Sequence, residues 1–278
     1  MVEIHQRSRT SKMRSFARRP VVWLSGVVAA AVSIALTNAM VPWIGAIVDP
    51  VFERGPAISV VSVATVRSDT FGRSVIFSRQ KMFSEAEIAQ LNNASDPVAW
   101  LEGRGGVTPD PLIIRLVLVG KRTEPVRILD MKTISTCSDP LDGTLFENPP
   151  AGSDESVAIN FDLDRTDPEA TYTDDKGRER SYFPSRTISL AQNEQQVLQI
   201  VVSTSKHFCK FRLRLSFLEG SDTNTMEIPR HANKAFKVTA YVPKSKFETI
   251  YLGGVLCPSG YSKADGSYLT GEAMTCEG

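Results

Sequence analysis

Histidine is scarce in this chain, whose 278 residues include only three histidines and four cysteines. Beyond the N-terminal segment only His207 and His231 remain. The cysteines lack the CxxC-like or histidine-containing spacing of structural zinc sites. No Gly-x-Ser-x-Gly occurs either, which removes the nucleophile elbow, although a Ser/His/Asp set assembled from distant positions stays open. The sequence therefore predicts no cofactor and gives no catalytic motif.

Charge is absent from a long N-terminal stretch, because no residue from Val21 to Val48 is ionisable as an acid or base. Crossing a bilayer takes roughly 20 apolar residues at ~1.5 Å of rise each. Trp23 and Trp43 are far enough apart, about 30 Å on a helix, to reach opposite interfaces. We expect a transmembrane anchor over 21–48, with Trp23 and Trp43 at the membrane interfaces.

The segment 1–20 before this anchor is basic, and Glu3 is its one acid. An excess of Lys and Arg beside a membrane helix keeps that side in the cytoplasm. We therefore expect a protein of the cell membrane with a single span, a cytoplasmic N-terminus and the bulk of the chain extracytoplasmic. The residues that set this topology are Arg7, Arg9, Lys12, Arg14, Arg18 and Arg19.

The competing interpretation of this segment is a cleaved signal peptide. Its best cleavage site, Thr37-Asn38-Ala39, is followed by more apolar chain up to Val48. A signal peptide normally has a shorter apolar region of about 7–15 residues that ends at the cleavage site. The pattern favours an uncleaved signal-anchor.

The chain from Asp49 onward has no basic excess, with 26 basic against 30 acidic residues, a net charge of about −4. This composition argues against nucleic acid as a partner. The partners we expect are the lipid bilayer and an envelope protein or polymer, and the sequence leaves the oligomeric state open.

All four cysteines follow the anchor, on the side expected to be oxidising. An even number there indicates a disulfide framework, and four cysteines allow three connectivities. We favour Cys137–Cys209, which would join two strands, and Cys257–Cys276, which would close a C-terminal loop.

Residues 49–56 form a linker ending in Gly55-Pro56, and 57–278 form the β-rich extracytoplasmic domain. The clearest strand is 208–217, where apolar side chains alternate with Lys210, Arg212 and Arg214. A row of cations on such a strand is either a solvated face or a binding surface for an anionic polymer or lipid headgroups. Further strands are expected at 58–66, 74–78, 112–119, 126–135, 157–163, 182–190, 196–204, 236–242 and 249–252.

Short strands separated by turns are typical of an immunoglobulin-like antiparallel sandwich. We expect 126–135 to pair with 112–119 across the turn at Gly120. Two helices form a small insertion at about 84–103, because Ser84 with Glu87 makes a capping box and Asp96 precedes Pro97. A domain of this length is either one elaborated sandwich or two packed subdomains.

An acidic loop offers the one candidate metal site. Asp162, Asp164 and Asp167 lie close enough in sequence for their carboxylates to converge on a hard cation such as Ca²⁺. The spacing departs from a calcium-binding loop, which requires a third Asp or Asn followed by Gly. A solvated loop with internal salt bridges is the alternative.

Several short motifs together resemble a family of uncharacterised actinobacterial single-pass membrane proteins with a β-rich extracytoplasmic domain. The resemblance spans nearly the whole chain, although the Cys257–Cys276 tail departs from it. It implies an envelope location and the Cys137–Cys209 pair, but no activity. Besides the basic tail, the anchor and these cysteines, the matching motifs are Arg67-Ser68-Asp69-Thr70, Arg104-Gly105-Gly106-Val107, Gly143-Thr144-Leu145-Phe146, Pro149-Pro150-Ala151-Gly152, Phe161-Asp162-Leu163-Asp164 and Phe236-Lys237-Val238-Thr239.

The sequence thus favours a membrane-anchored extracytoplasmic binding module over an enzyme. The alternative is a cell-envelope hydrolase whose site would lie between the sandwich and the helical insertion.

Overall fold

The computed structural model describes residues 55–66, 74–149, 158–230, 233–266 and 268. All of them belong to one of the two compact units of the chain, Gly55–Gly278. Within these ranges no helix has the length and apolar character needed to cross a membrane. The expected anchor at 21–48, its interface tryptophans Trp23 and Trp43, and the basic tail lie outside the described residues.

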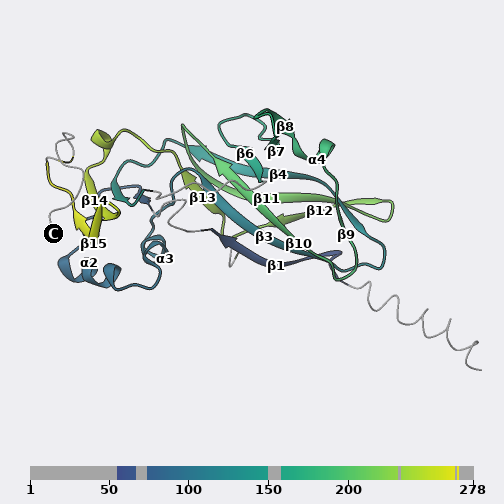
Figure 1. Ribbon diagram of the computed structural model, residues 1–278, viewed down its shortest axis with the longest axis horizontal. Coiled ribbons are helices and arrows are strands. Elements are labelled where there is room, and N and C mark those ends of the chain that lie inside the picture. The colour runs from purple at the N-terminus through teal and green to yellow at the C-terminus, as the bar shows by residue number, and fades with distance from the viewer. Residues whose placement is uncertain (1–54, 67–73, 150–157, 231–232, 267, 269–278) are drawn as a thin grey trace, which may run out of the picture. The chain divides into compact units, whose positions relative to one another are not determined.

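The described part is mainly β, with short helices between some strands (Figure 1). The helical elements are α2 (Glu85–Asn92), α3 (Pro97–Gly103), α4 (Tyr182–Ser185) and the 3₁₀ turn η2 (Lys244–Lys246). The strands are β1 (Ile58–Thr65), β2 (Val75–Phe77), β3 (Leu112–Gly120), β4 (Val126–Ser138), β5 (Thr144–Glu147), β6 (Ile159–Asp162), β7 (Thr171–Thr173), β8 (Glu179–Ser181), β9 (Ile188–Leu190), β10 (Gln195–Ser203), β11 (Phe208–Glu219), β12 (Asp222–Ile228), β13 (Phe236–Thr239), β14 (Thr249–Gly254) and β15 (Cys257–Lys263).

Two sheets share the largest core. The first has six strands in the order β1-β3-β10-β6-β7-β8, and the second has the order β12-β11-β4-β9 with β13 also paired to β11. Leu116 and Ile200 of the first sheet and Ile128 and Leu213 of the second belong to the same cluster of buried side chains. A two-sheet sandwich follows from this shared core, because each sheet buries one apolar face against the other.

The prediction of a wholly antiparallel sandwich was wrong. β6 runs parallel to β10, with Ile159 opposite Ile200. β4 does not pair with β3 either: β3 lies between β1 and β10, whereas β4 pairs with β11 and β9. After β3 the chain crosses to the other sheet. The consecutive strands β3 and β4 therefore do not form a hairpin, and they cover the core from opposite sides.

β11 confirms the predicted alternation. Its side chains at Cys209, Phe211, Leu213, Leu215 and Phe217 are buried, and Lys210 and Arg214 are exposed. The expected strand 182–190 was wrong in its first half, which forms α4, and only Ile188–Leu190 is extended. β12 was missed because its residues are mostly exposed and polar, and it is positioned by the tight turn at Gly220, where φ is +60°.

A third, smaller sheet lies apart from the sandwich core and has the order β15-β14-β5-β2. The two predicted helices, α2 and α3, pack on it: Leu91 and Leu101 share a cluster with Phe146 and Tyr251. Ser84 and Glu87 form the predicted capping box, and Asp96 caps α3. The helices therefore belong to a second packing unit of the domain, formed with the small sheet around its own core.

The disulfide Cys137–Cys209 is confirmed. The two residues are directly opposite each other in the antiparallel pair β4–β11, with their Cα atoms 4.1 Å apart. Cys257 is also disulfide-bonded, and its predicted partner Cys276 lies outside the described residues. The first bond closes a loop across 72 residues of sequence and ties the two longest strands of the second sheet together.

Replacing both Cys137 and Cys209 with alanine should lower the free energy of unfolding by about 2–5 kcal/mol, because the crosslink restricts the unfolded chain. Urea unfolding of the oxidised protein and of the double variant, followed by near-UV circular dichroism, measures the difference. An unchanged midpoint would show that the bond contributes no stability. As a control, thiol labelling of the unreduced, denatured protein should find no free cysteine.

Candidate functional site

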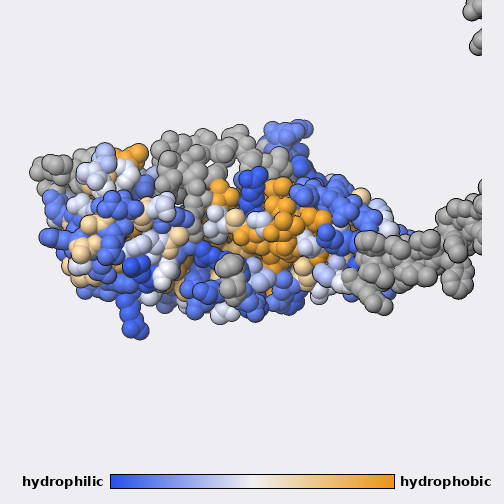
Figure 2. Space-filling view, turned by 90° about the horizontal axis from the view of Figure 1, so that it is seen from below, coloured by the Kyte–Doolittle hydropathy of each residue, from blue (hydrophilic) through white to orange (hydrophobic). Residues whose placement is uncertain are grey.

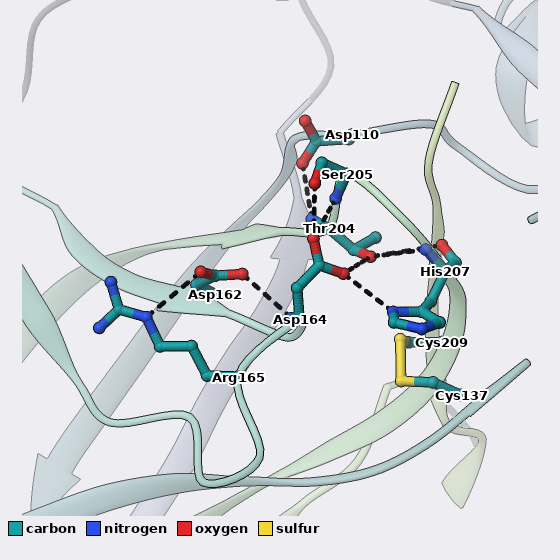
Figure 3. A network of polar contacts seen from close by, with 9 residues as sticks. All are labelled: Asp110, Cys137, Asp162, Asp164, Arg165, Thr204, Ser205, His207 and Cys209. Atoms are coloured by element: carbon teal, nitrogen blue, oxygen red, sulfur yellow. Dashed lines mark hydrogen bonds and ion pairs between the residues drawn. A yellow bond between two sulfur atoms is a disulfide. The ribbon is translucent and has the colours of Figure 1, made fainter. Parts of the chain in front are cut away.

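A polar network forms around Asp164, where the chain leaves β6 (Figure 3). Its Oδ1 accepts hydrogen bonds from Thr204 Oγ1 at 2.7 Å and from His207 Nδ1 at 2.9 Å. Its Oδ2 accepts from the backbone N–H and from Oγ of Ser205, both at 2.7 Å. This one carboxylate thus accepts hydrogen bonds from three residues of the segment that connects β10 of the first sheet to β11 of the second.

Asp110 holds the same connection from the other side. It lies just before β3, and its Oδ1 accepts a hydrogen bond from the backbone N–H of Thr204 at 3.0 Å. The backbone N–H of Asp110 donates in turn to the carbonyl of Thr239, at the end of β13. The two aspartates therefore link the ends of strands from both sheets.

The two carboxyl groups have opposite pKa shifts. Burial would raise the pKa of Asp164, but the hydrogen bonds from Ser205, Thr204 and His207 outweigh burial and hold it well below its usual range. For Asp110, burial dominates over the hydrogen bonds from Thr204 and Ser203, and its pKa is raised. The surroundings of Asp164 therefore stabilise its ionised form, and the surroundings of Asp110 destabilise its ionised form.

This network contains Ser, His and Asp but not in the order that activates a serine. In a hydrolase triad the histidine lies between the serine and the carboxylate. Here Asp164 lies between them and accepts a hydrogen bond from each. Because the carboxylate only accepts, His207 Nδ1 carries the proton, and Nε2 has no hydrogen-bond partner among the residues described. The geometry locks a loop and does not activate Ser205.

The carboxylates predicted to bind a cation have protein partners instead. Asp162 accepts from the backbone N–H of Asp164 and forms an ion pair with Arg165, and Asp167 lies 3.8 Å from Lys132. Across the described ranges no group of three or more His, Cys, Asp or Glu side chains is arranged to hold a metal ion. The structure therefore gives the predicted cation site no support, and the alternative of a salt-bridged loop describes these contacts.

A pocket of about 510 Å³ lies between α3, β13 and the residues Arg230, Lys234 and Ala235, which precede β13. Its charged lining consists of Glu102 from α3 and three cations, Arg230, Lys234 and Lys237. Arg230 Nη2 donates to Glu102 Oε2, and Thr108 Oγ1 donates to Glu102 Oε1 at 3.1 Å. This volume falls in the range of small-ligand sites.

The wall of this pocket is rigid. Val107 exchanges two backbone hydrogen bonds with Ile76 of β2, at 2.8 and 2.9 Å. No side chain fits at Gly106, because a Cβ there would lie 2.3 Å from Val75 Cγ1. The segment Thr108–Asp110 then runs along β13, with the Thr239 N–H donating to the Thr108 carbonyl at 3.4 Å. Lys237 on β13 therefore lines a pocket whose opposite wall is held by backbone hydrogen bonds.

A second hollow of about 420 Å³ lies over β4 and α4 and has a mixed lining. Its carboxylates are Asp130 and Glu169, and its cation is Lys132. Burial raises the pKa of Asp130. Two carboxylates and one cation make a mixed lining, and this hollow therefore indicates no ligand class.

The cation row on β11 is partly neutralised. Arg212 and Arg214 both pair with Glu227 on β12, at 3.3 and 3.1 Å. β11 is also an interior strand, with β4 on one side and β12 and β13 on the other. These cations therefore do not protect an exposed sheet edge. Of the three, only Lys210 has no acidic partner among the described residues.

Hydrophobic residues also gather on the surface over the sandwich, with hydrophilic residues around them (Figure 2). Two valines of the first sheet, Val61 on β1 and Val197 on β10, have 59% and 46% of their surface exposed. Exposed apolar patches of this kind often mark interaction surfaces.

Comparison with known proteins gives no relative for this chain. No protein-family model matches it, and no curated protein matches it. The resemblance to actinobacterial membrane proteins thus remains an expectation, and the site must be judged on its own geometry.

The sequence analysis missed Glu102, Arg230, Lys234 and Lys237, and also the role of Asp110. Glu102 and Arg230 are 128 residues apart, so no local pattern connects them. The available signal was compositional: Arg230, Lys234 and Lys237 follow one another with no acid among them.

Asp164→Asn should lower the free energy of unfolding at pH 7 by about 2–4 kcal/mol, because the amide places an N–H₂ group against donors. Asp110→Asn is the matched control: it keeps an acceptor for Thr204 and removes a costly charge, so we expect a change within about 1 kcal/mol. Chemical denaturation of both variants measures the difference.

The pH dependence of the two sites has opposite sign. Because its folded-state pKa is depressed, Asp164 stabilises the fold above the unfolded pKa of about 3.9, and this contribution is lost as the pH falls below it. Asp110 has a raised folded-state pKa, so its contribution is complete below the unfolded pKa and is lost as the pH rises through the raised folded-state pKa. The difference in unfolding free energy between Asp164→Asn and Asp110→Asn should therefore shrink from pH 7 to pH 3. A difference that does not change with pH would contradict the opposite pKa shifts.

Proposed function

We propose that this protein is a membrane-anchored extracytoplasmic binding module whose ligand occupies the pocket between α3 and β13. The anchor is the uncharged run 21–48, and the basic tail before it directs the rest of the chain outward. The disulfide Cys137–Cys209 supports this placement, since such bonds persist in oxidising compartments. In this proposal the immunoglobulin-like sandwich is the scaffold and the small sheet with its helices completes the binding site.

The lining of the pocket carries the proposal. Charged groups converge there from two packing units: Glu102 from α3, and Arg230, Lys234 and Lys237 from the sandwich. The hydroxyl of Thr108 donates to Glu102, so it is committed to a structural contact. A rigid, half-open site with convergent charges is suited to recognition.

The alternative, a cell-envelope hydrolase, would place its site in this same pocket. Its described lining contains no histidine, serine or cysteine, and His207 belongs to the separate Asp164 network. The contacts therefore favour binding over nucleophilic catalysis.

The orientation can be tested with a reporter that is active only outside the cytoplasm. Alkaline phosphatase fused after Val48 should be active, because the uncharged run carries it across the bilayer. The matched control is a fusion after Arg19, before that run, which should be inactive. An inactive fusion after Val48 removes the extracytoplasmic placement.

Occupancy of the pocket can be tested in intact cells with a photo-crosslinking amino acid. Ala99 is exposed and lines the pocket, whereas Ala191 is exposed at the turn between β9 and β10. A crosslinker at position 99 should give a discrete adduct after irradiation, and one at position 191 should not. Equal labelling from both positions, or none from 99, would contradict a ligand at this site.

A further inference from the structure

The pocket between α3 and β13 concentrates cations in a way that the fold itself does not explain. Arg230 and Lys234 form an antiparallel bridge and therefore lie opposite each other. Lys237 of β13 lies directly opposite Lys210 of β11 in the sheet register. Like charges placed opposite each other in a sheet destabilise it. A bound anion would relieve the repulsion within each pair.

Among the described residues, the neutralising groups of the lining are too few. Glu102 is the one carboxylate in the lining, and it pairs with Arg230. Lys234, Lys237 and the remaining N–H groups of Arg230 have no hydrogen-bond partner in the described part of the chain. The lining thus has three positive charges and one negative charge, an excess of about two.

Arg230 is oriented for a planar or tetrahedral oxyanion. Its side chain is 29% exposed, and its Nη2 donates to Glu102, whose side chain is 11% exposed. A guanidinium held in this way presents its other N–H groups as a fork that matches phosphate oxygens. Exposed lysines on both sides then supply charge without demanding a fixed geometry.

We infer that this pocket binds a phosphoryl group, held by Arg230, Lys234 and Lys237. A phosphate monoester carries about −1.5 to −2 charges near neutral pH, which complements the excess of about two positive charges. The inference deepens the proposed function and rests on it for the biological setting, because it names the ligand class of the same pocket. The phosphoryl group belongs either to a soluble phosphate or to a lipid headgroup, and the two share this chemistry.

The test uses the full chain in nonionic detergent and isothermal titration with two probes. Inorganic phosphate represents a soluble source, and glycerol 3-phosphate, the deacylated headgroup of phosphatidic acid, represents a lipid source with the charge of a monoester. We expect saturable binding that weakens with added salt, as contacts between charges do. The probe with the lower dissociation constant identifies the source of the phosphoryl group.

Lys234→Gln and Lys237→Gln should each weaken binding by about tenfold. Lys176→Gln, at an exposed position between β7 and β8, is the matched control and should bind as the unmodified protein does. Lys210→Gln should have a smaller effect, because Lys210 contributes through Lys237. All four replaced side chains are exposed, so the variants should stay folded. Thermal unfolding should be unchanged in Lys176→Gln and slightly higher in the other three, because each of those removes one member of a like-charge pair.

Binding that is equal in the Lys176, Lys234 and Lys237 variants, or no saturable binding of either probe, overturns the inference. Acetate that binds as tightly as phosphate overturns the phosphoryl assignment. These failures are separate from failure of the proposed function. An active fusion after Val48 and an adduct from position 99, together with no phosphate binding, would leave the module in place with a different ligand. An inactive fusion would remove the extracytoplasmic setting and leave the phosphate result unaffected.

Discussion

The pairing of β11 with β4 is the constraint on which the rest of the structure depends. β11 is bonded to β4, β12 and β13, so three strands take their position from it. Its register is fixed in two ways. A slip of one residue would turn its buried side chains outward, and the disulfide between Cys137 and Cys209 joins the two strands covalently. Its two faces therefore have different uses: one forms the core, and the other holds the cations.

The entry of the chain into β11 is as well defined as the strand itself. Asp164 accepts four hydrogen bonds from three residues of the β10–β11 connection, and Asp110 accepts a fifth bond from the same segment. The anchoring carboxylates come from loops of the first sheet, whereas β11 belongs to the second. The network therefore links the two layers at one end of the sandwich. It also explains why serine, histidine and aspartate meet without forming a catalytic set.

The candidate binding site follows from the same architecture. β13 takes its place from β11, so Lys237 comes to lie opposite Lys210. Across the pocket, α3 takes its place from the small sheet, whose core contains Leu101. The ion pair between Glu102 and Arg230 connects these two packing units. A phosphoryl ligand would add charge complementarity where the protein supplies only one carboxylate.

The features that the sequence predicted well are local. The capping box at Ser84 and Glu87 depends on residues three positions apart, and the burial pattern of β11 on a period of two. Such patterns need no knowledge of the rest of the chain. The strand at 182–190 was half wrong because its neighbourhood allows a short helix, and periodicity does not separate the two over so few residues.

By itself, the sequence determined the mainly-β character, both helices near 84–103 and the cysteines that pair within the second sheet. The uncharged run and basic tail likewise define the membrane expectation, which lies outside the described residues. Only the tertiary structure decided that β6 lies parallel to β10, that β4 and β3 belong to different sheets, and that Glu102 meets Arg230. The physical reason is that these contacts join residues far apart in the chain. Their partners are selected by how the sheets pack, and no local spacing of side chains records that choice.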